Sequence, residues 1–235
     1  MPENKELLLQ RHALEWLDET IPRSLVFGDT YFSKAGGMEE TSHVFIGWNE
    51  LPARWPQMNH CTIGELGFGT GLNFLETIRQ WQRLRLPGSR LHYIAFEAYP
   101  MSRHDLERSL SRWPDLAEGT ARLVAIWPAG GDTLEAEFAE GACLTIHFAD
   151  ANAALPALQF EADAWYLDGF APSRNPQMWG AELMQSVFGH TRPGGTFATY
   201  TCAGWVRRNL VAAGFEVEKL PGFAGKREML RGRRP

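Results

Sequence analysis

The sequence predicts an α/β fold in which helices cover both faces of a mostly parallel sheet. From residue 61 onward, short apolar segments alternate with segments of helical periodicity, as is typical of this fold class. A glycine-rich turn at 67–71 joins the first expected strand to the first expected helix, and acidic residues end three of the strands. Open sheets of this kind bind ligands at the carboxyl ends of their strands.

Six segments are expected to be strands of this sheet, because each is short, apolar and bounded by turn residues. In chain order they are 61–66, 91–97, 121–127, 143–150, 164–168 and 196–202. Residues 215–220 and 227–230 are expected to form a C-terminal antiparallel hairpin.

Four helices are expected between these strands. In the first, apolar residues recur at helical spacing after the glycine turn: Leu72, Leu75, Ile78 and Trp81. Ser102 and Asp105 form a plausible capping box for the second helix. The third ends before the turn at 192–195, and the fourth runs from Trp205 to Ala213 and stops at Gly214.

The region before the first strand has a different pattern. Segments 26–37 and 43–49 are expected to be short strands and turns. We therefore predict a small β-rich N-terminal extension at 1–58, packed on a main domain at 59–235.

Composition narrows the class of protein. The chain has 235 residues, of which 44% are hydrophobic and 12% aromatic, enough for a core and unlike a disordered chain. Its apolar runs are too short to span a membrane, and its N-terminus lacks the apolar core of a signal peptide. The three cysteines lie far apart and suggest neither a disulfide framework nor a zinc site. A cytoplasmic protein is expected.

The net charge of −5 hides local basic stretches. Residues 203–235 contain eight Lys or Arg against three acidic residues, and residues 79–112 contain seven against three. Such stretches are consistent with a phosphate-bearing partner, and equally with solvated helix faces.

The glycine turn is unlike the common phosphate-binding loops. Gly67, Gly69 and Gly71 do not give the G-x-G-x-x-G spacing of dinucleotide sites, because the sixth position is Leu72, and no G-K-[ST] sequence follows. The E-x-G-x-G-x-G spacing from Glu65 resembles the first motif of S-adenosylmethionine (SAM) methyltransferases. A turn that serves only tight packing is the alternative.

Acidic residues at strand ends favour a nucleoside site. Glu97 ends the second strand, where a carboxylate can hold both ribose hydroxyls. Asp150 ends the strand at 143–150, where it could accept a hydrogen bond from the adenine amino group, and Asp168 ends the next strand. Any one of them alone could be an ordinary cap or turn residue.

Four longer segments resemble the MnmC-type tRNA methyltransferases: 65–75, 167–179, 199–210 and 222–230. Segment 29–45 resembles the N-terminal part of the same family, so the similarity covers nearly the whole chain. The resemblance implies a Rossmann-like, SAM-dependent methyltransferase fold, in which the third strand is loosely patterned and the assignment at 121–127 less secure. It also implies methylation of the 5-aminomethyl group of wobble 2-thiouridine in tRNA, giving 5-methylaminomethyl-2-thiouridine.

The resemblance also implies roles for single residues. It places Asp168 in the catalytic centre and the cofactor on a set of residues around the glycine turn: Glu65, Gly67, Gly69, Gly71, Asn73, Glu97 and Asp150. Cys202 departs from the small Ser or Ala expected at its position. In many bacteria this domain is fused to an FAD-dependent oxidase that generates the amine, so an oxidase domain or protein is an expected partner beside the tRNA anticodon stem-loop.

The loop after Asp168 is expected to bind the acceptor. Phe170, Pro172, Pro176 and Trp179 would form an apolar wall that stacks on the base. Lys34, Arg174 and Asn175 would reach phosphates or the uridine edge. Packing at a helix start is an equal alternative for Trp179, and the same ambiguity applies to four other aromatic residues: Tyr31, Phe32, Tyr200 and Trp205.

The chemistry of amine methylation defines what Asp168 can do. With the lysine pKa of about 10.4 as a guide, neutralising a primary amine at pH 7 costs about 4.6 kcal/mol. A carboxylate favours the ammonium and is a weak base, so Asp168 is expected mainly to orient the amine and to stabilise the charge that develops on nitrogen.

Two other functions remain open. A methyltransferase for a small-molecule amine would share the cofactor loop without needing RNA, and a non-catalytic SAM-binding module would bind SAM without transfer. A metal hydrolase is poorly supported, because the seven histidines show no metal-ligand spacing.

Overall fold

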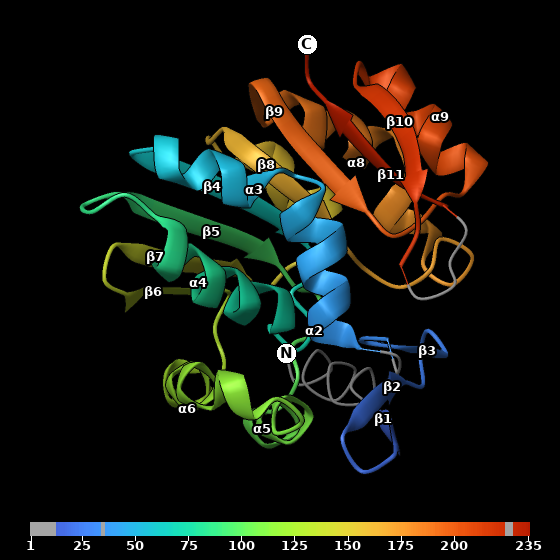
Figure 1. The fold of residues 1–235 in the computed structure, drawn as a ribbon. Coiled ribbons are helices and arrows are strands. Elements are labelled where there is room, and N and C mark those ends of the chain that lie inside the picture. Colours follow the sequence, from blue (N-terminus) through green and yellow to red (C-terminus); the bar gives the residue numbers. More distant parts are fainter. Residues whose placement is uncertain (1–12, 34–35, 224–227) are drawn as a thin grey trace.

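The computed structural model describes residues 13–33, 36–223 and 228–235. Its centre is an eight-stranded sheet with the strand order β10-β11-β9-β8-β4-β5-β7-β6 (Figure 1). The four central strands run in chain order β4, β5, β7 and β8 and pair in parallel: His60–Leu66, Arg90–Phe96, Ala142–His147 and Ala162–Leu167. This arrangement confirms the predicted fold class.

Helices cover both faces of the sheet, and each face has its own apolar core. One core contains residues of α4 (Leu72–Leu84), α5 (Arg103–Leu110) and α6 (Ala117–Ile126). The other contains residues of α7 (Ala151–Ala154), α8 (Ala181–Gly189) and α9 (Gly204–Ala213). Strand β8 serves both, because its successive side chains point to opposite faces: Tyr166 belongs to the first core and Trp165 to the second.

The strands at both edges of the sheet pair antiparallel with their neighbours. Strand β9 (Thr191–Thr199) pairs in parallel with β8, and the hairpin of β11 (Glu228–Arg233) and β10 (Glu216–Pro221) extends the sheet beyond it. The predicted C-terminal hairpin is therefore confirmed. At the other edge, β6 (Thr133–Ala139), which the sequence analysis missed, pairs antiparallel with β7.

The strand predicted at 121–127 is wrong. These residues belong mostly to α6, which follows the 3-10 turn η3 (Pro114–Leu116). Thr120, Leu123 and Trp127 are the buried positions, and spacings of three and four residues are those of a helix face. A short apolar run does not by itself distinguish a strand from a helix segment, and packing of this segment against α5 and the shared core decides here.

The N-terminal region is only partly β-structured. A small antiparallel sheet consists of β1 (Leu14–Leu17), β2 (Ile21–Ser24) and β3 (Asp29–Thr30). The strand expected at 43–49 is wrong, because the chain there is mainly the π-helical segment η1 (Thr41–Gly47). Residues of η1 pack against α4, and their burial favours a helix over an isolated strand. The domain boundary at residue 58 stays a prediction.

Short helical segments complete the chain: α2 (Gly37–Glu40), α3 (Leu51–Arg54), η2 (Trp55–Gln57), η4 (Leu155–Ala157) and η5 (Pro176–Trp179). Two predicted helix signals, the cap at Ser102 and the stop at Gly214, are confirmed. Ser102 Oγ accepts the Asp105 amide hydrogen at 3.1 Å, and Gly214 ends α9 with a φ of 115°. In the described part of the chain, no helix has the length and apolar character needed to cross a membrane.

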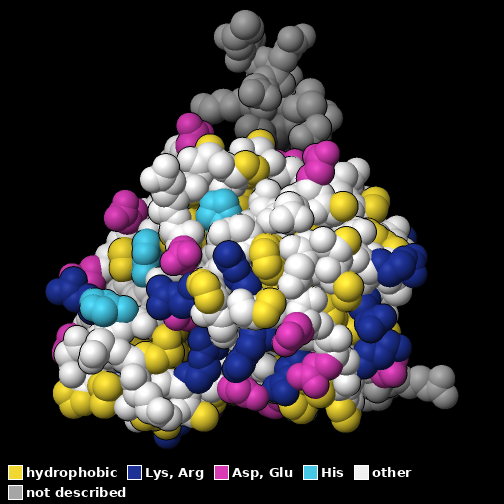
Figure 2. Space-filling model, turned by 90° about the horizontal axis from the view of Figure 1, so that it is seen from above, with side chains coloured by type: hydrophobic (Ala, Val, Ile, Leu, Met, Phe, Trp, Pro, Cys, Tyr) yellow, Lys and Arg dark blue, Asp and Glu magenta, His cyan; other side chains and the backbone are white. Residues whose placement is uncertain are grey.

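The basic C-terminal stretch is partly neutralised within the fold. Arg231 pairs with Glu218 and Glu50, and Lys219 pairs with Glu228. Figure 2, which views the molecule from above, shows a face on which Lys and Arg side chains gather near the middle with acidic side chains among them. That face therefore carries charges of both signs.

Candidate active site

A cavity of about 480 Å³ opens at the carboxyl ends of the central strands, within the usual size range of small-molecule sites. The strand register brings its main residues together. Leu66 of β4 pairs with Phe96 of β5 on one side and with Leu167 of β8 on the other. Gly67, Glu97 and Asp168 directly follow these three residues. They therefore lie side by side at the carboxyl ends of the strands.

The glycine loop runs against the end of β8. A Cβ at Gly67, whose φ is 87°, would lie 3.1 Å from the carbonyl oxygen of Asp168. Gly67 and Gly69, two of the residues expected to bind the cofactor, line the cavity. Gly71 does not line it: a Cβ there would lie 2.9 Å from side-chain atoms of Phe68 and Leu123. The packing interpretation therefore describes Gly71, whereas Gly67 and Gly69 line the cavity.

Glu97 presents its carboxylate at the tip of β5. The side chain is buried, its Oε2 accepts the Gly69 amide hydrogen at 2.8 Å, and its Oε1 accepts that of Tyr99 at 2.7 Å. Burial raises the pKa of Glu97 above its ordinary value, although both backbone donors oppose this shift. Since each oxygen has two lone pairs, the carboxylate can also accept hydrogen bonds from a vicinal diol.

Asp150 lies on the far side of the cavity, beyond β7. It lines the cavity and also caps α7, because its Oδ1 accepts hydrogen bonds from the backbone and side-chain nitrogens of Asn152, both at 2.9 Å. Asp150 therefore caps α7 and lines the cavity at the same time.

Asn73 links two carboxyl groups beneath the glycine loop. Its Nδ2 donates to Asp168 Oδ2 and to Glu65 Oε1, each at 2.8 Å. Glu65 is completely buried and does not line the cavity. Burial raises its pKa well above the ordinary value, and the neighbouring carboxylate of Asp168 adds to this. Glu65 thus supports the site from behind Asn73.

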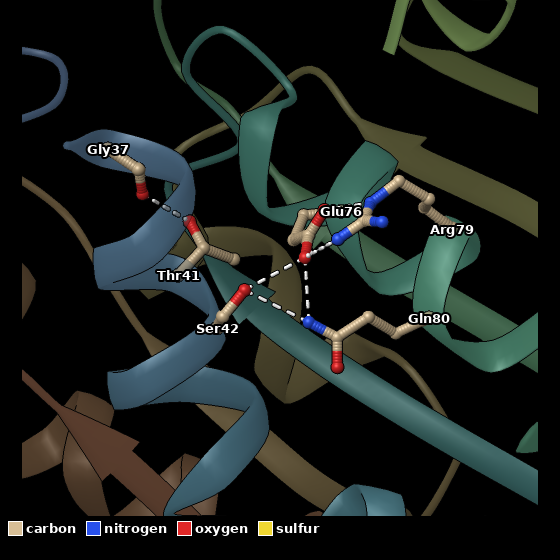
Figure 3. Close-up of polar contacts among 6 residues, drawn as sticks. All are labelled: Gly37, Thr41, Ser42, Glu76, Arg79 and Gln80. Atoms are coloured by element: carbon tan, nitrogen blue, oxygen red, sulfur yellow. Dashed lines mark hydrogen bonds and ion pairs between the residues drawn. The ribbon is translucent and has the colours of Figure 1, made fainter. Parts of the chain in front are cut away.

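The N-terminal region fixes the orientation of Asn73. The Thr41 hydroxyl lies 2.6 Å from Asn73 Oδ1, so the amide nitrogen of Asn73 points toward Glu65 and Asp168. Next to it, the buried Glu76 carboxylate accepts hydrogen bonds from Ser42, Arg79 and Gln80 (Figure 3). These contacts hold η1 against α4, and with it Thr41 against Asn73.

The loop after β8 divides into lining and supporting residues. Phe170 and Asn175 line the cavity, whereas Pro172, Arg174, Pro176 and Trp179 do not. Trp179 is only 1% exposed, and its Nε1 donates to the Phe170 carbonyl oxygen at 3.1 Å. This geometry agrees with the packing alternative for Trp179. Lys34 lies outside the described residues.

Several cavity residues come from the N-terminal region. Phe27, Asp29, Tyr31, Phe32 and Thr41 all line the cavity. Asp29 Oδ2 accepts the Ala171 amide hydrogen at 2.9 Å, which ties β3 to the loop after β8. Tyr31 and Phe32 were candidates from the sequence, whereas the other three were not, because no local pattern predicts which distant segments meet. Tyr200 also lines the cavity, whereas Trp205 does not.

The cavity suits a SAM-type ligand. Two glycines, the buried Glu97 carboxylate at a neighbouring strand tip and Asp150 beyond it line one cavity. The sequence comparison decides the family: the protein-family model described as S-adenosyl-L-methionine-dependent methyltransferase matches residues 114–235. The chain belongs to this methyltransferase family. The expected cofactor, SAM, is thereby confirmed.

Known relatives of the methyltransferase confirm the more specific resemblance. A relative from Pseudomonas fluorescens, named tRNA 5-methylaminomethyl-2-thiouridine biosynthesis bifunctional protein MnmC, is 45% identical over 94% of this chain and 34% of the relative. A protein of the same name from Caulobacter sp. is 42% identical over 92% of this chain and 37% of the relative. The chain spans about a third of the length of these curated relatives.

A solved structure shares the fold of the methyltransferase. MnmC2 from Aquifex aeolicus superposes with a TM-score of 0.75, at 21% sequence identity, over 99% of this chain and 77% of that one. The agreement extends the shared fold over the N-terminal region as well as the central sheet.

Proposed function

We propose that this methyltransferase methylates the 5-aminomethyl group of wobble 2-thiouridine in tRNA, giving 5-methylaminomethyl-2-thiouridine. One observation carries the proposal: the Asp168 carboxylate and the glycine loop open into the same cavity, beside the aromatic ring of Phe170. The names of the relatives from Pseudomonas fluorescens and Caulobacter sp. support the choice of acceptor.

Bound SAM supplies an electrophilic methyl group on a positively charged sulfur. The acceptor nitrogen must present a free lone pair, so a carboxylate that merely held the amine as an ammonium ion would slow the reaction. Asp168 Oδ1 accepts the Gly169 amide hydrogen at 2.8 Å and Oδ2 accepts the Asn73 hydrogen bond, which fixes the plane of the carboxylate. In this proposal, Asp168 orients the neutral amine through an N–H hydrogen bond and stabilises the positive charge that develops on nitrogen.

The cofactor-binding residues take separate roles in the proposal. Gly67 and Gly69 leave room for the ligand, Glu97 accepts hydrogen bonds from the ribose hydroxyls and Asp150 accepts one from the adenine amino group. Asn73 also lines the cavity, whereas Glu65 and Gly71 support this subsite from beneath.

The acceptor-binding residues come from the loop after β8. Phe170 and Asn175 contact the base or its edge, Pro172 and Trp179 hold the loop in shape, and Arg174 reaches a phosphate. For Lys34 the proposed role rests on the sequence alone.

The biological setting is also a proposal. The enzyme acts on the tRNA anticodon stem-loop in the cytoplasm, and an FAD-dependent oxidase domain or protein supplies the amine. The word "bifunctional" in the relatives' names and their greater length support a second activity in those proteins.

A single assay tests the proposed function. The protein is incubated with labelled SAM and tRNA from cells that lack the activity, and the modified nucleosides are identified by mass spectrometry. We expect 5-methylaminomethyl-2-thiouridine. Its absence would overturn the proposal, and methylation of a free amine metabolite without tRNA would favour the small-molecule alternative.

A further inference from the structure

The turn between β2 and β3 contains apolar residues on both of its sides. Leu25 and Val26 are 56% and 50% exposed, which makes them the two most exposed large hydrophobic residues in the described part of the chain. The next residue, Phe27, points the other way and lines the cavity. An apolar turn tip that is exposed beside a ligand site is typical of a surface that meets a partner.

Phe27 connects the two ends of the cavity. Its ring stacks on that of Phe170, with centroids 4.6 Å apart, and meets the edge of the Tyr99 ring at 5.6 Å. Phe170 follows Asp168 closely in the chain, whereas Tyr99 lies next to Glu97. Phe27 therefore joins the loop that carries Asp168 to the segment that carries Glu97, and its ring contributes an aromatic surface to the cavity.

Two guanidinium groups lie beside the same turn. A Cβ at Gly28 would be 3.3 Å from Arg174 Nη1 and 3.7 Å from Arg23 Nη2. Arg23 is held in place by Glu15 at 2.8 Å and by the Gly28 carbonyl oxygen. Within the described residues, no carboxylate pairs with Arg174. Gly28 stands between Phe27 and Asp29, which both line the cavity. Two positive charges beside this turn, one of them unneutralised, favour binding of an anion.

Together these residues match the parts of one nucleotide. We propose that the turn at 23–28 and Arg174 form a nucleotide clamp, in which Phe27 and Phe170 stack on the target base while Arg23 and Arg174 bind an adjacent phosphate. This inference rests on the proposed tRNA activity and assigns the segment that recognises the RNA. Asp29 anchors the clamp, because its bond to Ala171 joins the turn to the loop that carries Phe170 and Arg174.

Measurements of RNA affinity and of turnover distinguish the loss of the clamp from a general loss of folding. The ligand is an RNA hairpin with the sequence of the anticodon stem-loop and 5-aminomethyl-2-thiouridine at the wobble position. Its affinity is measured by fluorescence anisotropy at several salt concentrations in the presence of S-adenosylhomocysteine, and KM is measured in the methylation assay. The variants are Phe27→Leu, Phe27→Ala and Arg174→Ala, with Arg83→Ala on the exposed face of α4 as the matched control.

For Phe27→Ala we expect the RNA dissociation constant and KM to rise about tenfold, since stacking on an aromatic ring contributes on that order. Phe27→Leu keeps the apolar contact and should lie between Phe27→Ala and the wild type. Arg174→Ala should reduce the slope of log affinity against log salt concentration by about one, whereas Arg83→Ala should leave it unchanged. Affinity for SAM alone should be unchanged in Arg174→Ala and Arg83→Ala, because neither arginine lines the cavity.

The outcomes distinguish the clamp from the function on which it rests. If the wild type methylates the hairpin but Phe27→Ala and Arg174→Ala bind it with wild-type affinity and salt slope, the clamp is wrong and the proposed function stands. If the wild type neither binds nor methylates the hairpin, both are wrong.

Discussion

The side-chain amide of Asn73 donates a hydrogen bond of 2.8 Å to Asp168, and the same nitrogen donates one of equal length to Glu65. One residue of α4 thus holds the carboxylate at the end of β8 and is itself oriented by Thr41 from the N-terminal region. The proposed reacting centre therefore depends on three parts of the chain that are distant in sequence.

Substitution of Asp168 tests whether it orients the amine. We expect Asp168→Ala to lower kcat by about 100-fold or more, because a preorganised contact to the developing charge is lost. Asp168→Asn keeps a hydrogen-bond acceptor and should retain at least about tenfold more activity than Asp168→Ala. The measurement is the initial rate with aminomethylated tRNA and saturating SAM. Near-native turnover in both variants would remove Asp168 from the mechanism.

Substitution of Thr41 tests the support of Asn73. Thr41→Val has nearly the same shape but loses the hydroxyl that faces Asn73 Oδ1, so the amide is free to turn its oxygen toward Asp168. We expect kcat to fall about fivefold, corresponding to a hydrogen bond of about 1 kcal/mol, with little change in KM for SAM. Thr41→Ser restores the hydroxyl and should recover the activity. Equal rates for the Val and Ser variants would contradict this role.

Glu65 should make the stability depend on pH. Its pKa is raised well above the ordinary value in the folded protein, so unfolding releases a proton at any pH between the two values. Stability should therefore fall as pH rises from about the ordinary pKa toward the raised one. Glu65→Gln keeps an acceptor for Asn73 but cannot ionise, so its free energy of unfolding should fall less. The free energies of unfolding of the two proteins are compared by urea unfolding at pH 5, 6, 7 and 8. If they change with pH in the same way, Glu65 does not titrate as described.

Glu76 should stabilise the contact between η1 and α4. Its carboxyl group is buried and accepts hydrogen bonds from three side chains, so Glu76→Ala would leave those donors unsatisfied (Figure 3). We expect a loss of about 2–4 kcal/mol in the free energy of unfolding at pH 7. Gln82→Ala, on the exposed face of the same helix, is the matched control. A loss no larger than that of the control would disprove the role of Glu76.

The same carboxyl group predicts a second effect of pH. Burial tends to raise the pKa of Glu76, but hydrogen bonds from Arg79, Gln80 and Ser42 outweigh it and lower the pKa below its ordinary value. The stabilisation is therefore present above the ordinary pKa and is lost as pH falls through the lowered one. The difference in stability between the wild type and Glu76→Ala should shrink below about pH 4, as measured by urea unfolding.

The sequence was sufficient to predict the central sheet and the residues at the ends of its strands. A helix between two strands returns the chain so that the strands run parallel, and parallel strands have their carboxyl ends on the same side of the sheet. Gly67, Glu97 and Asp168 directly follow such strands, and their proximity could therefore be predicted without knowing any contact between them. Asp150 lies three residues beyond the end of β7, and the same reasoning placed it at that edge.

The local sequence could not decide whether the short apolar segments are strands or helices. Residues 43–49 and 121–127 were assigned as strands, but in the fold they belong mainly to η1 and α6. An apolar run of this length suits either structure. The deciding contribution is burial against α4 for η1 and against α5 for α6, which depends on residues elsewhere in the chain.

The sequence by itself determined the fold class, the glycine loop and the row of acidic residues, because strand and helix periodicities and backbone freedom are local properties. The tertiary structure alone decided that Thr41 orients Asn73, that Asp29 binds Ala171 and that Phe27 stacks on Phe170. These contacts join the N-terminal region to the site across long separations in sequence. They form only when the packed core of the sheet brings both partners to the same cavity.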